Sequence, residues 1–171
     1  MSVEEYYNRG VERQNSKNYN GAISDYTNAI RIKPDYGSAY FGRAYSKDEL
    51  KDYYGAIADY TKTIELIPNE SNAYYNRGIS KSNTKDHYGA IADYTKTIEL
   101  NPNDALAFLN RGNSKDELKD YYGAIADYTK SIELDPNFSK AYHNRGISKD
   151  NLKDYYGAIS DNTNAIKLDP N

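Results

Sequence analysis

The chain has 171 residues, a net charge of −3, a hydrophobic fraction of 38% and a charged fraction of 27%. This acidic balance disfavours nucleic acid as a partner, because nucleic-acid binders usually carry a basic stripe. No stretch approaches the roughly 18 apolar residues of a membrane-spanning helix, so no membrane contact is expected. The absence of cysteine excludes disulfides and thiol chemistry. The segment MSVEEYYNRG at the start has no secretion-signal pattern, and the cytoplasm is the expected location.

The chain is a fivefold array. The sequence AIADYTKTIEL occupies residues 56–66, returns unchanged at 90–100 and returns with one change at 124–134. Looser copies occupy residues 22–32 and 158–168. A proline follows every copy at a spacing of 34, at Pro34, Pro68, Pro102, Pro136 and Pro170. We divide the array into residues 3–36, 37–70, 71–104, 105–138 and 139–171.

Each repeat begins with a segment that predicts a first helix, as at residues 72–84, and a Lys-Asp turn follows it. An aspartate after this lysine is a predicted N-cap, because its short side chain accepts a hydrogen bond from a free backbone N–H. These aspartates are Asp52, Asp86, Asp120 and Asp154.

The second helix of each repeat carries its apolar side chains on one face, as Ala56, Tyr60 and Ile64 do at helical spacing. The proline ends this helix because it lacks an N–H and disfavours helix in the residue before it. A helix of about three turns is marginal alone in water, so its apolar face must pack against a neighbour. The sequence predicts ten antiparallel helices in one all-α domain over residues 1–171.

The third repeat contains a recognisable motif. It reads Tyr74-x-x-Arg77-Gly78-x-x-Lys81, then Ala90-x-x-x-Tyr94 and finally Pro102. The period, the small residues, the aromatic residue and the proline resemble the tetratricopeptide repeat (TPR) family, and the match covers the whole chain. The resemblance implies an α-solenoid, a right-handed superhelix of five helix-turn-helix repeats. It also implies a protein–protein interaction module that is not an enzyme and needs no cofactor.

Two charged positions depart from the family pattern. Arginine stands where the family usually has leucine before the glycine, at Arg9, Arg43, Arg77, Arg111 and Arg145. A second cation stands where tyrosine is usual, at Arg13, Lys47, Lys81, Lys115 and Lys149. We expect these long stems to lie on apolar surface with their charge in water. An aspartate also recurs, at Asp25, Asp59, Asp93, Asp127 and Asp161. Two interpretations are open, because the arginines and aspartates either form repeated ion pairs or are separately solvated.

The fifth repeat differs from the others at one core position. Asn162 stands where the other four repeats have a tyrosine in the second helix. Because terminal repeats of a solenoid usually carry a more polar outer face, we interpret Asn162 as a polar cap on this helix.

No arrangement of residues predicts catalysis or a metal site. His87 and His143 are the only histidines, and they lie in different repeats. The chain has no Gly-rich phosphate loop, HExxH motif or GxSxG motif. The Asp48-Glu49 pair recurs with the repeat, which is more typical of a solvated face than of a catalytic dyad.

The TPR resemblance implies that first helices line a concave groove. The sixth place of four repeats is asparagine, whose amide offers both a donor and an acceptor to an extended peptide backbone. These residues are Asn8, Asn76, Asn110 and Asn144. The alternative is that they are simply solvated. The fifth and ninth places add aromatic and apolar pockets, from Tyr7, Phe41, Tyr75, Leu109 and His143 together with Tyr45 and Asn113. Ile79 and Ile147 also occupy ninth places, and we interpret them as core residues between adjacent first helices.

We expect the partner to be a protein or peptide segment with apolar anchors and some basic residues, because Asp48, Asp116 and Asp150 make one edge acidic. Chaperone-binding TPR domains use a lysine at the fifth place, which this chain lacks, so an Hsp70 or Hsp90 adaptor is not predicted. The alternative function is a self-associating scaffold, a homo-oligomer that stacks through its end helices or convex face. An exposed row of tyrosines would serve it, at Tyr54, Tyr88, Tyr122 and Tyr156.

Overall fold

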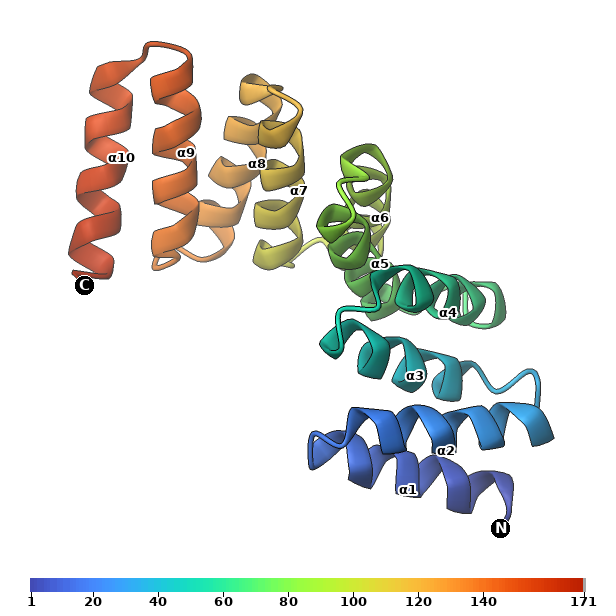
Figure 1. Ribbon diagram of the computed structural model, residues 1–171. Coiled ribbons are helices and arrows are strands. Elements are labelled where there is room, and N and C mark those ends of the chain that lie inside the picture. The colour runs from blue at the N-terminus through green and yellow to red at the C-terminus, as the bar shows by residue number, and fades with distance from the viewer. Residues whose placement is uncertain (171) are drawn as a thin grey trace. The chain divides into compact units, whose positions relative to one another are not determined.

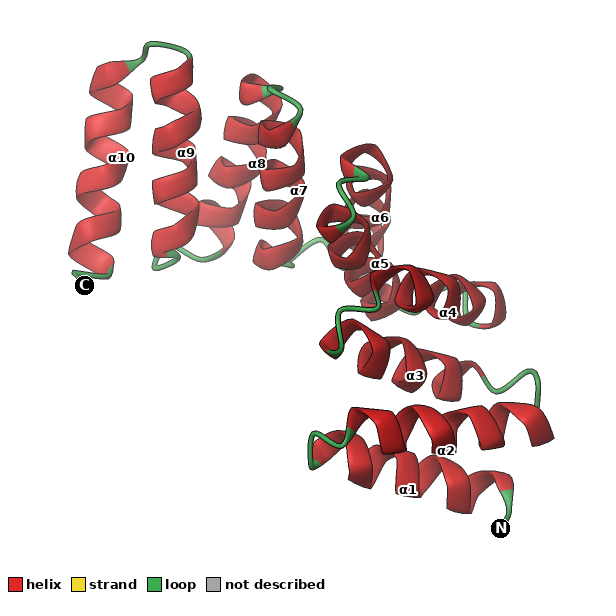
Figure 2. Ribbon diagram, viewed as in Figure 1, coloured by secondary structure: helices red, strands yellow, loops and turns green. Residues whose placement is uncertain are grey.

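The computed structural model describes residues 1–170, and in that range every regular element is a helix (Figure 1, Figure 2). The helices are α1 (Val3–Asn15), α2 (Tyr19–Ile32), α3 (Gly37–Glu49), α4 (Tyr53–Leu66), α5 (Ser71–Asn83), α6 (His87–Leu100), α7 (Ala105–Glu117), α8 (Tyr121–Leu134), α9 (Ser139–Asn151) and α10 (Tyr155–Leu168). The all-α prediction of two helices per repeat is confirmed. None of the helices within residues 1–170 has the length and apolar character needed to cross a membrane.

The chain forms two compact units, Met1–Asp86 and the part from His87 onward. Their boundary falls in the turn between α5 and α6, within the third repeat. In the first unit each helix of α1 to α5 packs against the next, and in the second unit α6 to α10 do the same (Figure 1). First helices also contact the next first helix, α1 with α3, α3 with α5 and α7 with α9. That the whole chain is one domain stays a prediction.

The second helices begin and end where local chemistry requires. The Asp52 carboxylate accepts the Gly55 N–H at 3.1 Å, and Asp120 and Asp154 cap α8 and α10 in the same way at 3.0 Å. These three predicted N-caps are confirmed. At the other end, α4 stops at Leu66, two residues before Pro68. Capping side chain and proline together fix the length of this helix.

A lysine in left-handed backbone conformation closes each turn within a repeat. The residues are Lys17, Lys51, Lys85, Lys119 and Lys153, with φ between 59° and 65°. Around Lys51, the Asp52 N–H donates to the Lys47 carbonyl at 2.9 Å, which completes the end of α3. For residues other than glycine this conformation costs about 1–2 kcal/mol, so the turn is held by its surroundings.

A tyrosine of the second helix fills the core of a hairpin. Tyr26, Tyr60 and Tyr128 are almost fully buried beside alanines such as Ala22. A Cβ atom placed on Gly112 would lie 2.6 Å from Cε1 of Tyr128, so the glycine of the first helix leaves room for the ring. Burial raises the pKa of all three tyrosines, which stay neutral.

Candidate functional site

A buried aspartate with two cations holds the two helices of a repeat together. The guanidinium of Arg43 donates from Nε and Nη2 to the two carboxylate oxygens of Asp59 at 2.8 and 2.7 Å. The Lys47 ammonium lies 2.8 Å from the same carboxylate. We call this set the cation–aspartate cluster, and it also occurs as Arg9–Arg13–Asp25, Arg111–Lys115–Asp127 and Arg145–Lys149–Asp161. Ion pairing is therefore confirmed for these four repeats.

The same arginine connects neighbouring repeats. Nη1 of Arg145 donates to the Thr129 hydroxyl in the preceding helix α8 at 3.0 Å, and its guanidinium lies over the Tyr142 ring at 5.7 Å. Equivalent bonds join Arg43 to Thr27, Arg77 to Thr61 and Arg111 to Thr95 at 3.0–3.1 Å. The expectation that these charges point into water is wrong, because the carboxylate and hydroxyl partners draw them between the helices.

Electrostatics favour the charged form of the aspartate. Burial alone would raise the pKa of Asp161, but hydrogen bonds from Arg145 and Lys149 outweigh it, and the pKa is lowered. Donors and acceptors of the cluster satisfy one another, so it holds the fold rather than offering a reactive group.

In the first unit, two predicted groove residues meet at one cavity. Tyr7 of α1 and Phe41 of α3 line a hollow of about 190 Å³. Its other lining residues are Ser38, Thr63, Ile67, Glu70 and Asn72. Tyr45 and Asn8 are exposed nearby along the chain, while Asn76 and Tyr75 are half-buried. The lining is mixed, with the aromatic rings and Ile67 beside four polar side chains.

In the second unit, α7 and α9 form a more polar cavity. It has a volume of about 310 Å³ and is lined by Asn113, Asp116, Glu117, Tyr128, Asn144 and Ile147. The Asn144 amide donates to Oδ1 of Asn113 at 2.8 Å, and the Tyr128 hydroxyl donates to the same oxygen at 2.9 Å. Two predicted groove asparagines are thus tied together, with one amide N–H and one oxygen of Asn144 left for a ligand. Asn110, a further predicted member, is half-buried.

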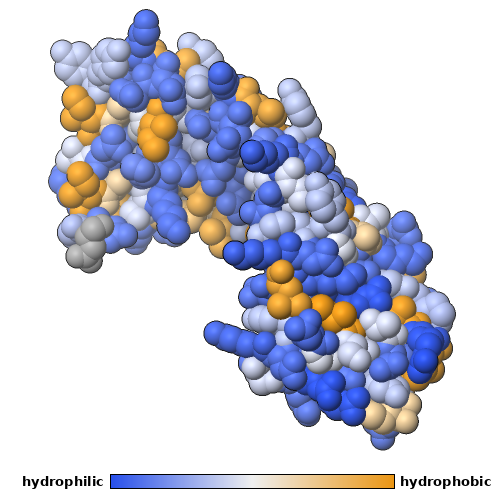
Figure 3. Space-filling model, viewed as in Figure 1, coloured by the Kyte–Doolittle hydropathy of each residue, from blue (hydrophilic) through white to orange (hydrophobic). Residues whose placement is uncertain are grey.

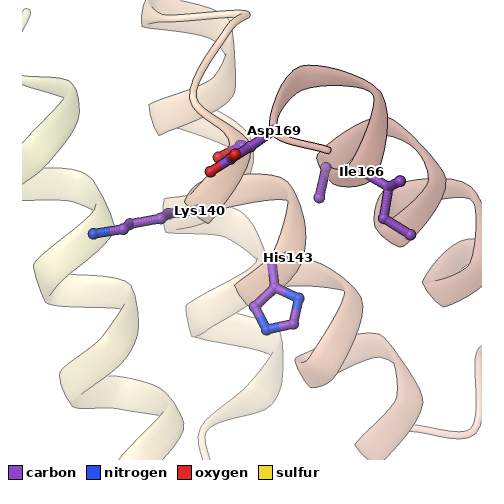
Figure 4. Close-up of a pocket in the computed structure, with 6 residues that line it drawn as sticks. Lys140, His143, Ile166 and Asp169 are labelled. Carbon is purple, nitrogen blue, oxygen red and sulfur yellow. The ribbon is translucent and has the colours of Figure 1, made fainter. Parts of the chain in front are cut away.

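His143 lies at a separate cavity between α9 and α10 (Figure 4). The hollow measures about 300 Å³, and its lining includes Lys140, His143, Ile166 and Asp169. In Figure 4 the imidazole and the Ile166 side chain project from neighbouring helices, while the Lys140 ammonium extends away from both. The predicted residue is therefore exposed on a first helix, but it lines a different cavity from Asn113 and Asn144.

Two placements on the first helices are corrected by the structure. Leu109 is only 5% exposed and packs with Ala124 and Tyr128 in the core, so it cannot line a groove. Ile147, which we interpreted as core, is 42% exposed because no first helix follows α9 within the described residues. Ile79, in the same place of an inner repeat, is half-buried.

Sequence reasoning missed a contact between successive first helices. The Ser80 hydroxyl donates to Asp48 at 2.9 Å, and Ser148 donates to Asp116. Burial raises the pKa of Asp48, while the bond from Ser80 acts in the opposite direction. The signal was a serine in the same place of four repeats, buried at Ser46, Ser80, Ser114 and Ser148. Two aspartates of the predicted acidic edge, Asp48 and Asp116, therefore bond to the next first helix.

The interpretation of Asn162 as a polar cap is wrong. Its Oδ1 is buried without a hydrogen-bond partner and lies 3.0 Å from the position of a Cβ on Gly146. Beside it is a cavity of about 420 Å³. The outer face of α10 exposes Ile159 and Ile166 at 64% and 65%. The small carboxamide leaves space where the other repeats have a tyrosine ring, and it does not make the face polar.

The predicted tyrosines of the second helices are exposed, at Tyr54, Tyr88, Tyr122 and Tyr156. Across the surface visible in Figure 3, hydrophobic residues form small patches separated by hydrophilic ones on both units. Successive helix pairs with small cavities along the first helices define a helical-repeat scaffold.

Comparison with known proteins identifies that class. Models of the tetratricopeptide repeat match residues 4–36, 37–70, 71–104 and 105–138, and a further model matches residues 127–160. The chain belongs to the tetratricopeptide repeat family. A search of curated protein sequences finds no match.

Solved structures share this fold. A crystal structure of MamA has 21% sequence identity and a TM-score of 0.94 over 98% of this chain and 92% of its own. MamA 41-end from Desulfovibrio magneticus RS-1 has 20% identity and a TM-score of 0.94, over 98% of this chain and 95% of its own. YrrB is described as a TPR protein with an unusual peptide-binding site. It has 19% identity and a TM-score of 0.88, over 97% of this chain and 86% of its own. At these identities the likeness concerns the fold alone.

Proposed function

We propose that this protein is an interaction module that binds a peptide segment of a partner protein through its first helices. The observation that carries the proposal is the cavity between α7 and α9, where Asn144, Glu117 and Ile147 converge. A carboxamide, a carboxylate and an exposed apolar side chain in one hollow suit a peptide better than a small metabolite. YrrB, a protein of the same fold, is described as having a peptide-binding site, which supports the proposal.

The chemistry of the cavity indicates which peptide binds. Asn144 keeps an amide N–H and an oxygen for a ligand backbone, because only one N–H is used by Asn113. Asp116 and Glu117 lie side by side, and Asp116 already accepts a bond from Ser148. A lysine or arginine of the peptide would balance the remaining negative charge, while an apolar neighbour packs on Ile147.

In the first unit, the cavity of Tyr7 and Phe41 is proposed to hold an apolar anchor of the same or another segment. It has the aromatic lining that small-molecule and peptide pockets share. The two cavities differ in polarity, so the module has one pocket for an apolar side chain and one for a basic side chain.

Random peptide display on the wild-type chain tests the proposal. Selected peptides should contain lysine or arginine beside an apolar residue, and Glu117→Gln should weaken their binding at least tenfold. Glu49→Gln is the matched control, because Glu49 occupies the same place in the other unit. Failure to select any peptide, or equal binding by Glu117→Gln, Ile147→Ala and the wild type, would contradict this function.

A further inference from the structure

The outer face of α10 is an unpaired version of a junction that the structure repeats. Within each unit, a second helix packs against the next first helix, as α8 packs on α9. The residues of α8 that α9 covers are half-buried, including Ile125 and Ile132. Their counterparts Ile159 and Ile166 are exposed on α10. In Figure 3 small hydrophobic patches, separated by hydrophilic residues, lie along the left edge of the view, where Figure 1 places α10.

The α1 face of another copy does not fit there. Where inner first helices carry a fully buried alanine and serine, such as Ala141 and Ser148, α1 carries Glu5 and Glu12, both exposed. Ala141 packs with Ala124 and Tyr128 of the preceding repeat, so this place lies inside a junction. Head-to-tail stacking would bury two carboxylates without a partner, which is costly.

The α10 face is complementary to itself. Ile159, Asn162 and Ile166 lie three and four residues apart, which places them on one side of the helix. The midpoint of the two isoleucines falls between Asn162 and Thr163. Two copies of α10 that run antiparallel about this midpoint place each Ile159 opposite an Ile166. Identical surfaces that meet across a two-fold axis form the commonest kind of homodimer contact.

Two cavities would receive these isoleucines. One, of about 420 Å³, is lined by Tyr155, Ile159 and Asn162 among others, and the other, of about 300 Å³, is lined by His143 and Ile166. Antiparallel pairing directs the partner's Ile166 to the first and the partner's Ile159 to the second. In this register each Asn162 stands opposite the partner's Thr163, next to the axis, while the Asn162 oxygen stays inside its own hairpin beside Gly146.

From these observations we infer that the protein forms a two-fold symmetric dimer through α10, with a second copy of the chain as the occupant of this face. The contact uses one helix per protomer, so it is smaller than the roughly 1,200–2,000 Å² of stable interfaces. The dimer is therefore weak and depends on concentration. Ile147 lines both the cavity of Asn144 and Glu117 and the cavity that would receive the partner's Ile166, whereas Glu117 lines only the first, so a change at Glu117 separates the two proposals.

Cysteine cross-linking tests the dimer cleanly because the natural chain has no cysteine. Thr163→Cys places the thiol beside the axis, within reach of the Cα separation of about 4.4–6.8 Å that a disulfide requires. Mild oxidation should give a covalent dimer, and Ile159→Lys added to this variant should abolish it. Asn20→Cys, exposed on α2, is the matched control and should stay monomeric.

The outcomes separate the occupants of the face. Sedimentation at about 1 mM should show a dimer for the wild type and a monomer for Ile166→Lys, while Glu117→Gln keeps the dimer. Cross-linking of Thr163→Cys with a Glu12→Cys chain would show head-to-tail stacking and overturn the inference. A wild type that stays monomeric, with no cross-link, would also overturn the inference.

Discussion

The hairpins α7–α8 and α9–α10 share the cation–aspartate cluster but differ at several core positions, among them Tyr128, which is replaced by Asn162, and Ser131, which is replaced by Ala165. In both, the arginine donates to the aspartate at 2.7–2.9 Å and the lysine lies 2.8 Å away. Tyr128 fills the first hairpin and donates to Asn113, whereas Asn162 leaves an unpaired oxygen and a cavity in the second. The comparison teaches that the charged cluster is common to both hairpins, whereas Tyr128 and Asn144 meet at Asn113 and join three helices only around the first hairpin.

Removing the shared aspartate should have the largest effect. Asp127→Ala leaves Arg111 and Lys115, which are mostly buried, without a counter-charge, and we expect a loss of about 3–5 kcal/mol in the free energy of unfolding. Asp161→Ala should cost as much in the other hairpin. Urea unfolding followed by circular dichroism measures both. A much smaller loss for Asp161→Ala would show that the two clusters are not equivalent.

Exchanging Tyr128 and Asn162 should lower the stability of the first hairpin and raise that of the second. Tyr128→Asn removes a buried ring, and we expect it to cost about 3 kcal/mol. Asn162→Tyr should stabilise the second hairpin by about 1–2 kcal/mol, because Gly146 leaves the same space as Gly112. Hydrogen exchange in α9 and α10 reports the gain. No gain from Asn162→Tyr would mean that the cavity cannot accept a ring.

Acid should weaken the cluster of the α9–α10 hairpin. The pKa of Asp161 is lowered in the folded state, so the charged form stabilises the fold above its unfolded pKa near about 3.9. That stability is lost as the pH falls below this value through the folded pKa. Melting temperatures measured from pH 6 downward should fall in this window for the wild type. Asp161→Asn should remove the part of the slope that this residue contributes.

A smaller loss of stability is expected when a threonine that accepts a hydrogen bond from arginine is replaced, compared with one that does not. Thr129 accepts a hydrogen bond from Arg145, whereas Thr163 has only the bond that its own hydroxyl donates to the Ile159 carbonyl. Thr129→Val should cost about 1 kcal/mol, and Thr163→Val close to nothing. The Thr129 hydroxyl also donates to a helix carbonyl, so the difference isolates the arginine bond. Equal losses would show that this bond contributes nothing.

The smallest expected change lies in the turns, where both hairpins should respond alike. Lys119 and Lys153 have φ values of 61° and 63°, a conformation that glycine adopts without strain. Lys119→Gly and Lys153→Gly should each raise the free energy of unfolding by about 0.5–1 kcal/mol. A loss at either position would mean that the lysine side chain stabilises the turn.

The features that depend on local signals, such as helix boundaries and the repeat, could be predicted from the sequence. Helix starts at Asp52 and ends before Pro68 follow from hydrogen bonding within a few residues, and the period of 34 identified the repeats. It could not decide between paired and solvated arginines, because this depends on the helix 16 residues away, as for Arg43 and Asp59. Ile147 was misplaced for a related reason, since no first helix covers it within the described residues. Leu109 was misplaced because its shorter side chain stays in the core, whereas Phe41 in the same place is half-buried.

The shared cluster also affects how such a chain can change length. Residues 46–62 and 114–130 are identical, so recombination between them would delete residues 46–113 as a block. After that event Arg43 would stand the same number of residues from Asp127 as it now stands from Asp59, and Thr27 would keep its donor. Each junction carries its own bonding partners, so whole repeats can be lost or gained in evolution without a new interface.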